Sequence, residues 1–308
     1  MSKAEPNTTC KISVVVATYN RAPLLIEMLD SFYAQDFPPV DFELLLVNNN
    51  ANDNTPAVAQ RYTDNPGFHY LFEPVQGLSP ARNRAIGESR GEIIAFLDDD
   101  VIVDRHWMRH LLACYAQTGA DAVGGRSYLI IRGTPPPWFG PDFRGYLSEV
   151  NLGNHRCDAG DGRRLFGLNV SFRRSALDIT GLFDPDLGRS GGALLCGEER
   201  QILARIHAAG GKLFYEPEAV VGHIVQADRL NLAYFQRLCD GAGRSRARIE
   251  SPAAGWTALQ RRFEAALKAA LYTILLFAAR PLGRNHYLYR AMQCRRTRIA
   301  ALREERSS

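Results

Sequence analysis

Three consecutive carboxylates, Asp98, Asp99 and Asp100, directly follow the apolar run Ile93–Leu97. Such a run is typical of a parallel strand that is buried on both faces, and open α/β sheets bind their ligands outside the carboxyl ends of such strands. Neighbouring carboxylates repel one another, so the triplet favours a bound cation, and Mg²⁺ and Mn²⁺ prefer oxygen ligands. A solvated turn whose Asp side chains cap the next helix explains this stretch equally well. The surrounding elements must decide between the two interpretations.

Strands and helices alternate over the first hundred residues. Runs of β-branched, apolar and aromatic residues predict strands at residues 11–17, 42–47 and 68–72. Pro23 and Pro56 stand where helices begin, because proline fits the first helical turn. This order predicts a βαβ half-domain with a nucleotide-type crevice beside the acidic triplet.

Two common phosphate-binding motifs are missing from the sequence. No Gly-x-Gly-x-x-Gly follows the first predicted strand, and no Gly-Lys-Ser/Thr loop occurs anywhere. Those motifs cradle the phosphates of dinucleotides and nucleoside triphosphates with backbone N–H groups. If the crevice binds phosphates, a metal ion and side chains must therefore hold them.

The cysteines and the N-terminal residues favour a reducing compartment. The 308-residue chain has six scattered cysteines without any Cys-x-x-Cys pair, which argues against a structural zinc site and a disulfide framework. Residues 1–11 are polar and lack the apolar segment of a signal peptide. We therefore expect a cytoplasmic protein, folded as one large domain or two modest ones.

The charge of the chain is unevenly distributed. Residues 244–308 hold 14 Lys and Arg against 4 Asp and Glu, whereas residues 1–243 hold 23 against 29. A basic tail on an acidic body predicts an anionic partner, either a membrane or a nucleic acid. The tail has no nucleic-acid-binding motif and no interleaved aromatic residues, so we expect no nucleic-acid partner.

The basic tail contains a strongly apolar helical segment. This segment, residues 267–279, is only about a dozen residues long, whereas a helix that spans a membrane needs about 20. Basic residues surround this segment, so the 260–290 helix is predicted to lie in the surface of an anionic membrane, on the inner face of the cell membrane. Alternatively, it packs on the rest of the chain or on a second copy in a homo-oligomer. The basic residues are Arg261, Arg262, Lys268, Arg280 and Arg284.

Six short motifs, in order along residues 11–225, resemble those of family 2 glycosyltransferases with the GT-A fold. Each motif alone is weakly specific, but their common order makes the resemblance strong. The motifs are Val14–Arg21, Gly77–Ile86, Phe96–Asp100, Gly167–Arg174, Gly191–Glu199 and Tyr215–His223.

This resemblance implies a fold and a domain organisation. The GT-A fold is an α/β fold with a Rossmann-like mixed sheet flanked by helices. Residues 1–228 would form the glycosyltransferase domain, with a nucleotide-binding half at about 11–105 and an acceptor half at 106–228. Residues 229–308, where the resemblance fades, would form a basic helical C-terminal extension.

The resemblance also implies an activity. Its members transfer a sugar from a nucleotide-diphospho-sugar donor to a hydroxyl of a saccharide or glycolipid acceptor, with inversion, in the synthesis of polysaccharides and glycoconjugates. A divalent cation, Mn²⁺ or Mg²⁺, assists the departing nucleoside diphosphate. A catalytically silent nucleotide-sugar-binding or scaffold protein on the same fold is the alternative.

Roles for the acidic triplet follow by position in the motifs. Asp98 would face the ribose and help to hold the metal, Asp100 would bind the metal, and Asp99 can substitute for either. His223 lies where many relatives have a histidine that completes the metal or diphosphate contact. A histidine at a strand end is about as often a satisfied polar residue, so both interpretations stay open.

The pair Glu198-Glu199 matches the segment that supplies the general base. Relatives usually have Glu-Asp there, so Glu199 would accept the proton of the acceptor hydroxyl and Glu198 would orient the acceptor. Glutamate lengthens the arm by one methylene, which weakens the assignment. Both residues also suit the first turn of a helix, where acidic side chains are favoured for another reason.

Asn48 departs from the family pattern, in which an aspartate contacts the base of the nucleotide. Its amide oxygen can still accept a hydrogen bond from N3–H of uracil or thymine, but the amide adds a donor and removes a charge. Uridine is therefore our first choice, while thymidine and guanosine donors are less excluded than usual. The resemblance also implies that Thr18, Arg21 and Arg82 complete the nucleotide pocket.

Overall fold

The computed structural model describes residues 10–192, 194–249 and 256–279, together with residues 288, 290–292 and 295. The chain divides into two compact units. The first comprises Met1–Tyr128, Ser148–Asp186 and Glu198–Ile224, and the second comprises Leu129–Leu147, Leu187–Gly197 and Val225–Ser308.

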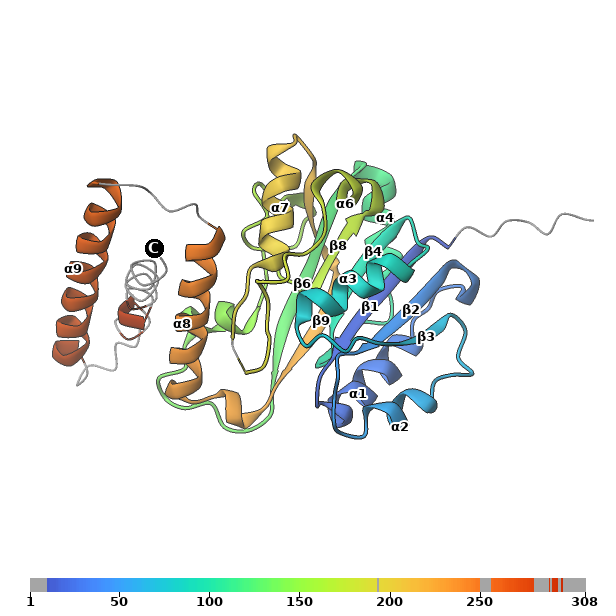
Figure 1. The fold of residues 1–308 in the computed structure, drawn as a ribbon, viewed down its shortest axis with the longest axis horizontal. Helices are drawn as coiled ribbons and strands as arrows, with labels where there is room; N and C mark the ends of the chain where they lie inside the picture. The colour runs from blue at the N-terminus through green and yellow to red at the C-terminus, as the bar shows by residue number, and fades with distance from the viewer. Residues whose placement is uncertain are drawn as a thin grey trace, which may run out of the picture. The chain divides into compact units, whose positions relative to one another are not determined.

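A mixed sheet of nine strands runs through the described residues, which confirms the predicted fold class. Four parallel strands lie side by side in the order β3 (Phe68–Phe72), β2 (Phe42–Asn48), β1 (Ile12–Thr18) and β4 (Ile93–Asp98) (Figure 1). The sheet continues through β8 (Asn169–Arg173), β6 (Ala122–Ile131), β9 (Leu213–Val225) and β5 (Val101–Val103). A short strand, β7 (Cys157–Asp158), pairs with β9.

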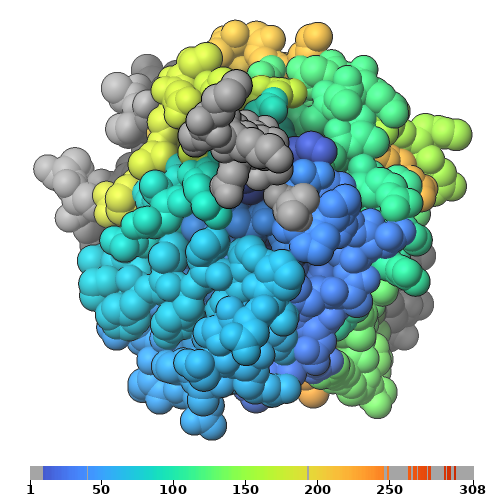
Figure 2. All heavy atoms as spheres, turned by 90° about the vertical axis from the view of Figure 1, so that its right-hand side faces the viewer, coloured from blue at the N-terminus to red at the C-terminus, as the bar shows by residue number. Residues whose placement is uncertain are grey.

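The register of the parallel strands gathers the predicted polar residues at one edge. Thr18 lies opposite Asn48, and its neighbour Ala17 lies opposite Asp98. The antiparallel strands add residues from far along the chain, because β5 follows the acidic triplet directly and places Val101 opposite His223 of β9. Residues from 10 to about 100 form the continuous blue and cyan surface of Figure 2.

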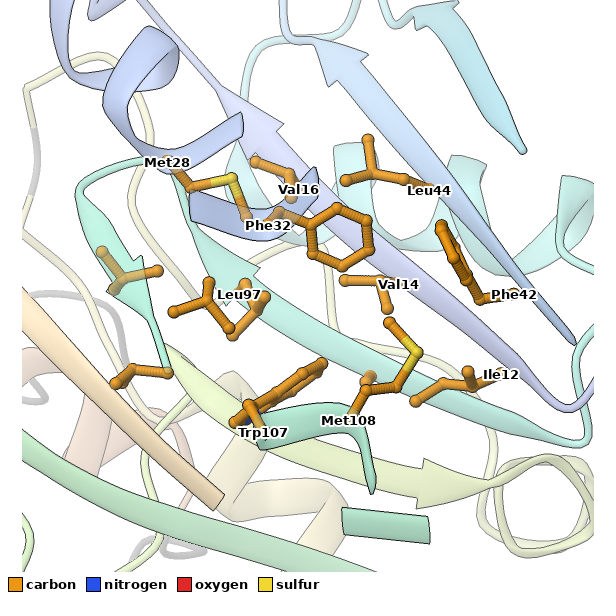
Figure 3. Packing of buried hydrophobic residues seen from close by; sticks show 14 of the residues in the cluster. Ile12, Val14, Val16, Met28, Phe32, Phe42, Leu44, Leu97, Trp107 and Met108 are labelled. Carbon is orange, nitrogen blue, oxygen red and sulfur yellow. The ribbon is translucent and has the colours of Figure 1, made fainter. Parts of the chain in front are cut away.

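Helices cover both faces of the sheet, because successive strand residues point to opposite sides. On one face α1 (Ala22–Tyr33), α2 (Thr55–Gln60) and α4 (Trp107–Thr118) bury a core that Figure 3 shows in part. On the other face α3 (Leu78–Glu88), α6 (Arg174–Thr180) and α7 (Glu198–Ala208) pack on the intervening residues. These two cores fix the sheet edge rigidly.

The second unit has its own aromatic core. Trp138, Phe139 and Phe143, on and beside the short helix α5 (Pro141–Arg144), pack on Phe235 of α8 (Leu232–Ile249). The ring centroids of Trp138 and Phe235 are 5.3 Å apart. The proline-rich segment before α5 is therefore anchored by aromatic packing within this unit.

The C-terminal helix α9 (Trp256–Ala279) has 24 residues, so it begins earlier than the apolar segment that starts at residue 267. Alanines and other good helix formers precede that segment, which accounts for the longer helix. Arg280 and Arg284 lie outside the described residues. Within the described part of the chain, no helix is long and apolar enough to span a bilayer.

Candidate active site

The three carboxylates at the end of β4 point to three different sets of partners. Asp98 lies 3.3 Å from a guanidinium nitrogen of Arg82, whereas Asp99 accepts a hydrogen bond of 2.8 Å from the hydroxyl of Thr18. Asp99 and Asp100 are both buried, and the side chain of Asp100 is only 1% exposed. The acidic triplet therefore packs into the first unit, with Asp99 and Asp100 buried, and is not a solvated turn.

Arg21 joins the two buried carboxylates. A single nitrogen, Nη1, lies 3.0 Å from Asp99 Oδ1 and 2.7 Å from Asp100 Oδ2. Burial raises the pKa of Asp99, and Arg21 offsets part of that rise while Asp100 adds to it. Burial alone would lower the pKa of Arg21, but the carboxylates of Asp99 and Asp100 raise it overall, so the guanidinium stays charged.

His223 and Asp100 form a corner that suits a divalent cation. Nε2 of His223 lies 3.5 Å from Asp100 Oδ1, and the backbone N–H of Ile224 donates to the carbonyl of Asp100 at 2.8 Å. Imidazole and carboxylate are both ligands of Mn²⁺. No group of three or more His, Cys, Asp or Glu among the described residues could hold a metal by itself. The corner fits a cation that takes its other ligands from substrate phosphates, as Mg²⁺ commonly does.

Arg82 links a carboxylate at the end of β4 with one at the start of α7. Its Nη1 donates to Glu198 at 2.9 Å, and its Nη2 donates to the carbonyl of Gly167 at 3.0 Å while facing Asp98. The side chain is 3% exposed, so it is a buried structural cation. Arg82 thus contacts the carboxylates of Asp98 and Glu198. Its expected contact with the nucleotide stays a prediction.

The guanidinium of Arg82 packs against two aromatic rings and lies close to the backbone of Gly167. Its guanidinium carbon lies 5.3 Å from the ring centroid of Phe96 and 5.4 Å from that of Phe183, within cation–π range. A Cβ at position 167 would lie 2.8 Å from Nη2 of Arg82, a distance that side chains do not tolerate. This close approach explains the glycine at residue 167.

The two glutamates at the start of α7 differ in their environments. Glu198 is 4% exposed at its side chain and is bound to Arg82, so a proton acceptor role would compete with this ion pair. Burial and the neighbouring Glu198 raise the pKa of Glu199 to about 8, although Arg82 lowers it. A carboxylate with a pKa near the working pH suits a general base, and the assignment of that role to Glu199 stays a prediction.

Asn48 is held in one orientation at the end of β2. Its Oδ1 accepts a hydrogen bond of 2.8 Å from the backbone N–H of Ala51, so its Nδ2 faces Tyr70 and donates to the phenol oxygen at 2.8 Å. Tyr70 lies on the edge strand β3 and is 37% exposed. Sequence patterns predict only a weak strand around Tyr70, because it is the pairing of β3 with β2 that brings this residue to Asn48.

Comparison with known proteins identifies the family. Residues 13–178 match the profile of Glycosyl transferase family 2. The succinoglycan biosynthesis protein ExoM of Rhizobium meliloti (strain 1021) is 31% identical over 249 residues, which cover 79% of this chain and 76% of ExoM. The chain belongs to glycosyltransferase family 2. It is therefore a transferase enzyme, and the resemblance seen in its motifs is confirmed.

Solved structures agree on the fold of this glycosyltransferase. The mannosyltransferase PcManGT from Pyrobaculum calidifontis, in complex with GDP-Man and Mn²⁺, superposes with a TM-score of 0.67 at 20% identity, covering 99% of this chain and 90% of that one. S. aureus TarS in complex with UDP gives a TM-score of 0.56 at 18% identity, covering 97% of this chain and 92% of the other. Both similarities show the GT-A fold.

Removing the charge of Arg82 should destabilise the glycosyltransferase. Arg82→Met is expected to lower the free energy of unfolding by about 3–5 kcal/mol, because Glu198 stays buried without its cation. The double variant Arg82→Met/Glu198→Met should recover much of this loss in urea unfolding. Arg84→Met, on the exposed side of the same helix, should change it by less than about 0.5 kcal/mol. A double variant no more stable than Arg82→Met would contradict this role.

Proposed function

We propose that this glycosyltransferase is a metal-dependent, inverting enzyme that transfers a sugar from a UDP-sugar to a hydroxyl of a saccharide or glycolipid. The observation that carries the proposal is that Arg82 joins Asp98 of the acidic triplet to Glu198, the neighbour of Glu199. Asp100 and His223 supply a cation corner, while Glu199 supplies a buried carboxylate with a pKa of about 8. A role in polysaccharide or glycoconjugate synthesis is supported by the similarity to ExoM, a succinoglycan biosynthesis protein.

The donor would be held by side chains at the ends of the parallel strands. Asp100 and His223 would bind Mn²⁺ or Mg²⁺, which supplies positive charge to the departing nucleoside diphosphate. The side chain of Asp98 is 29% exposed and can reach the ribose while keeping its contact with Arg82. No phosphate-cradling glycine loop is needed in this arrangement.

Asn48 and Tyr70 would read the base. The amide oxygen of Asn48 keeps one lone pair beyond its bond from Ala51, and this lone pair can accept from N3–H of uracil. The Tyr70 hydroxyl already accepts from Asn48, so its own hydrogen can be donated to a carbonyl of the base. One acceptor beside one donor matches the edge of uracil or thymine, which supports a uridine donor.

Glu199 would remove the proton of the acceptor hydroxyl as its oxygen attacks the anomeric carbon of the donor sugar. The bond from that carbon to the diphosphate oxygen breaks in the same displacement, so the configuration inverts. Glu198, fixed by Arg82, would orient the acceptor beside Glu199. A retaining reaction would need another carboxylate as nucleophile.

A panel of nucleotide-sugars with Mn²⁺, assayed for released nucleotide, tests the proposal. We expect turnover of a UDP-sugar, and Asp100→Ala should lower kcat by about 10²–10³-fold, as the loss of a group that stabilises transition-state charge does. Asp178→Ala, which removes an exposed carboxylate of α6, is the matched control and should leave kcat unchanged. Equal activity with and without metal would overturn the metal dependence. Tight binding of UDP without any turnover would instead favour a catalytically silent binding protein.

The activity should depend on pH through Glu199. We expect kcat/KM to rise with pH up to about 8, because Glu199 must lose its proton before it can act as a base. Glu199→Gln should lower kcat by about 10²–10⁴-fold, whereas Glu218→Gln, at an exposed position, should leave the pH profile unchanged. A flat profile across that range in the wild type would exclude Glu199 as the base.

Unfolding provides a check of the same pKa that needs no substrate. Because the folded-state pKa of Glu199 lies above its unfolded value, its contribution to stability is complete below the unfolded pKa and is lost as the pH rises through about 8. The free energy of unfolding of the wild type should therefore fall as the pH rises from the unfolded-state pKa to about 8, and it should fall less in Glu199→Gln.

We also propose that α9 docks on an anionic membrane, which would place the enzyme beside a glycolipid acceptor. Its large exposed apolar side chains lie three or four residues apart and form one stripe, with exposures between 51% and 69%. Lys268, on the flank of this stripe, is exposed, and the surrounding sequence is basic. Such a helix lies in a membrane surface instead of crossing it. The stripe consists of Phe263, Leu267, Leu271, Ile274 and Phe277.

Charged substitutions in the stripe should abolish membrane binding. The double variant Ile274→Asp/Phe277→Asp is expected to lower co-sedimentation with phosphatidylglycerol-containing vesicles by more than about tenfold, because each side chain loses roughly 1.5–3 kcal/mol of apolar burial. Ile179→Asp, at a position that is 78% exposed in the first unit, is the control and should bind like the wild type. Equal binding of the double variant would show that α9 packs on protein and not on lipid.

A further inference from the structure

Arg21 occupies the position at which the acidic triplet most needs positive charge. Its Nη1 lies 3.0 Å from Asp99 and 2.7 Å from Asp100, so two buried carboxylates share one positive charge. Thr18 fixes the other oxygen of Asp99 at 2.8 Å.

The same carboxylate serves two cations in the proposed function. Asp100 would bind the metal with His223, yet its Oδ2 is already paired with Arg21. A guanidinium and a divalent ion on one carboxylate repel each other strongly in a buried site, where the local dielectric constant is low. Release of Arg21 from Oδ2 would therefore strengthen the binding of a metal ion at Oδ1 of Asp100.

Arg21 is placed so that it can leave. Its side chain is 29% exposed, while Asp100 beside it is 1% exposed, so the arginine enters the cluster from the solvent side. It is the residue immediately before α1, and its backbone carbonyl starts that helix by accepting from the N–H of Leu25. The backbone is thus fixed while the side chain can turn, and a guanidinium binds diphosphate oxygens with favourable fork geometry.

We propose that Arg21 is an exchangeable counter-cation that keeps the divalent metal from binding Asp100 until a nucleoside diphosphate arrives and takes the guanidinium. This inference rests on the proposed function, because it assumes the donor and metal positions given above. Its consequence is that nucleotide and metal bind cooperatively. By linkage, each raises the affinity for the other by the same factor.

Binding of Mn²⁺ alone, followed by the EPR signal of the free ion, tests the proposal without any turnover. Arg21→Gln should bind Mn²⁺ at least about tenfold more tightly than the wild type, because a competing charge is removed. UDP should raise the Mn²⁺ affinity of the wild type by a larger factor than that of Arg21→Gln. Arg84→Gln makes the same change in net charge on the exposed side of α3 and should behave as wild type.

A second variant removes the same positive charge with a different side chain. Arg21→Met keeps most of the apolar stem of the arginine, so Mn²⁺ alone should again bind more tightly than to the wild type. This variant decides the matter if Arg21→Gln does not fold, as judged by circular dichroism. Unchanged or weaker Mn²⁺ binding by the folded variants would overturn the counter-cation role. A wild type that binds neither UDP nor UDP with Mn²⁺ would overturn the proposed function itself.

Discussion

Two adjacent carboxylates buried at the end of one strand are the constraint on which the site depends. Asp99 and Asp100 are removed from water by the sheet and its helices, and buried charges persist only when they are paired and hydrogen-bonded. The chain provides a guanidinium from β1–α1, a hydroxyl from β1 and an imidazole from β9. Each of these partners reaches the triplet because the sheet places its strand there.

A second buried cation extends this arrangement to α7. Arg82, on α3, is bonded to Glu198 of α7 and lies beside Asp98 of β4, so it connects the acidic triplet with the start of that helix. Burial first and the neighbouring Glu198 second raise the pKa of Glu199, although Arg82 lowers it. The two neighbouring glutamates thus differ in their surroundings: Glu198 is bound to Arg82, and Glu199 is a buried carboxyl beside it.

The sequence was sufficient to predict the sheet edge and its polar residues. Buried runs ending in Thr18, Asn48 and Asp98 follow from strand periodicity, and the parallel register aligns their ends. The partners of the charged side chains could not be predicted in the same way. Arg82 and Glu198 are 116 residues apart, and only the packing of α3 and α7 on the same face brings them together.

Smaller features escaped the sequence for related physical reasons. Tyr70 lies in a short edge strand whose exposed residues carry no clear alternation, so its role depends on its pairing with β2. The bridging position of Arg21 depends on side-chain torsions and on the burial of its two partners. The early start of α9 reflects helix propensity outside the apolar segment, where periodicity gives little signal.

A crystal structure with Mn²⁺ and UDP, recorded with anomalous scattering at the manganese edge, tests the central claim most directly. We predict an anomalous peak in contact with a carboxylate oxygen of Asp100 and with the diphosphate, with the guanidinium of Arg21 turned from Asp100 to a phosphate oxygen. UDP bound with no manganese at Asp100 would contradict the proposed metal site. Manganese at Asp100 while Arg21 still bridges both aspartates would contradict the exchange of Arg21.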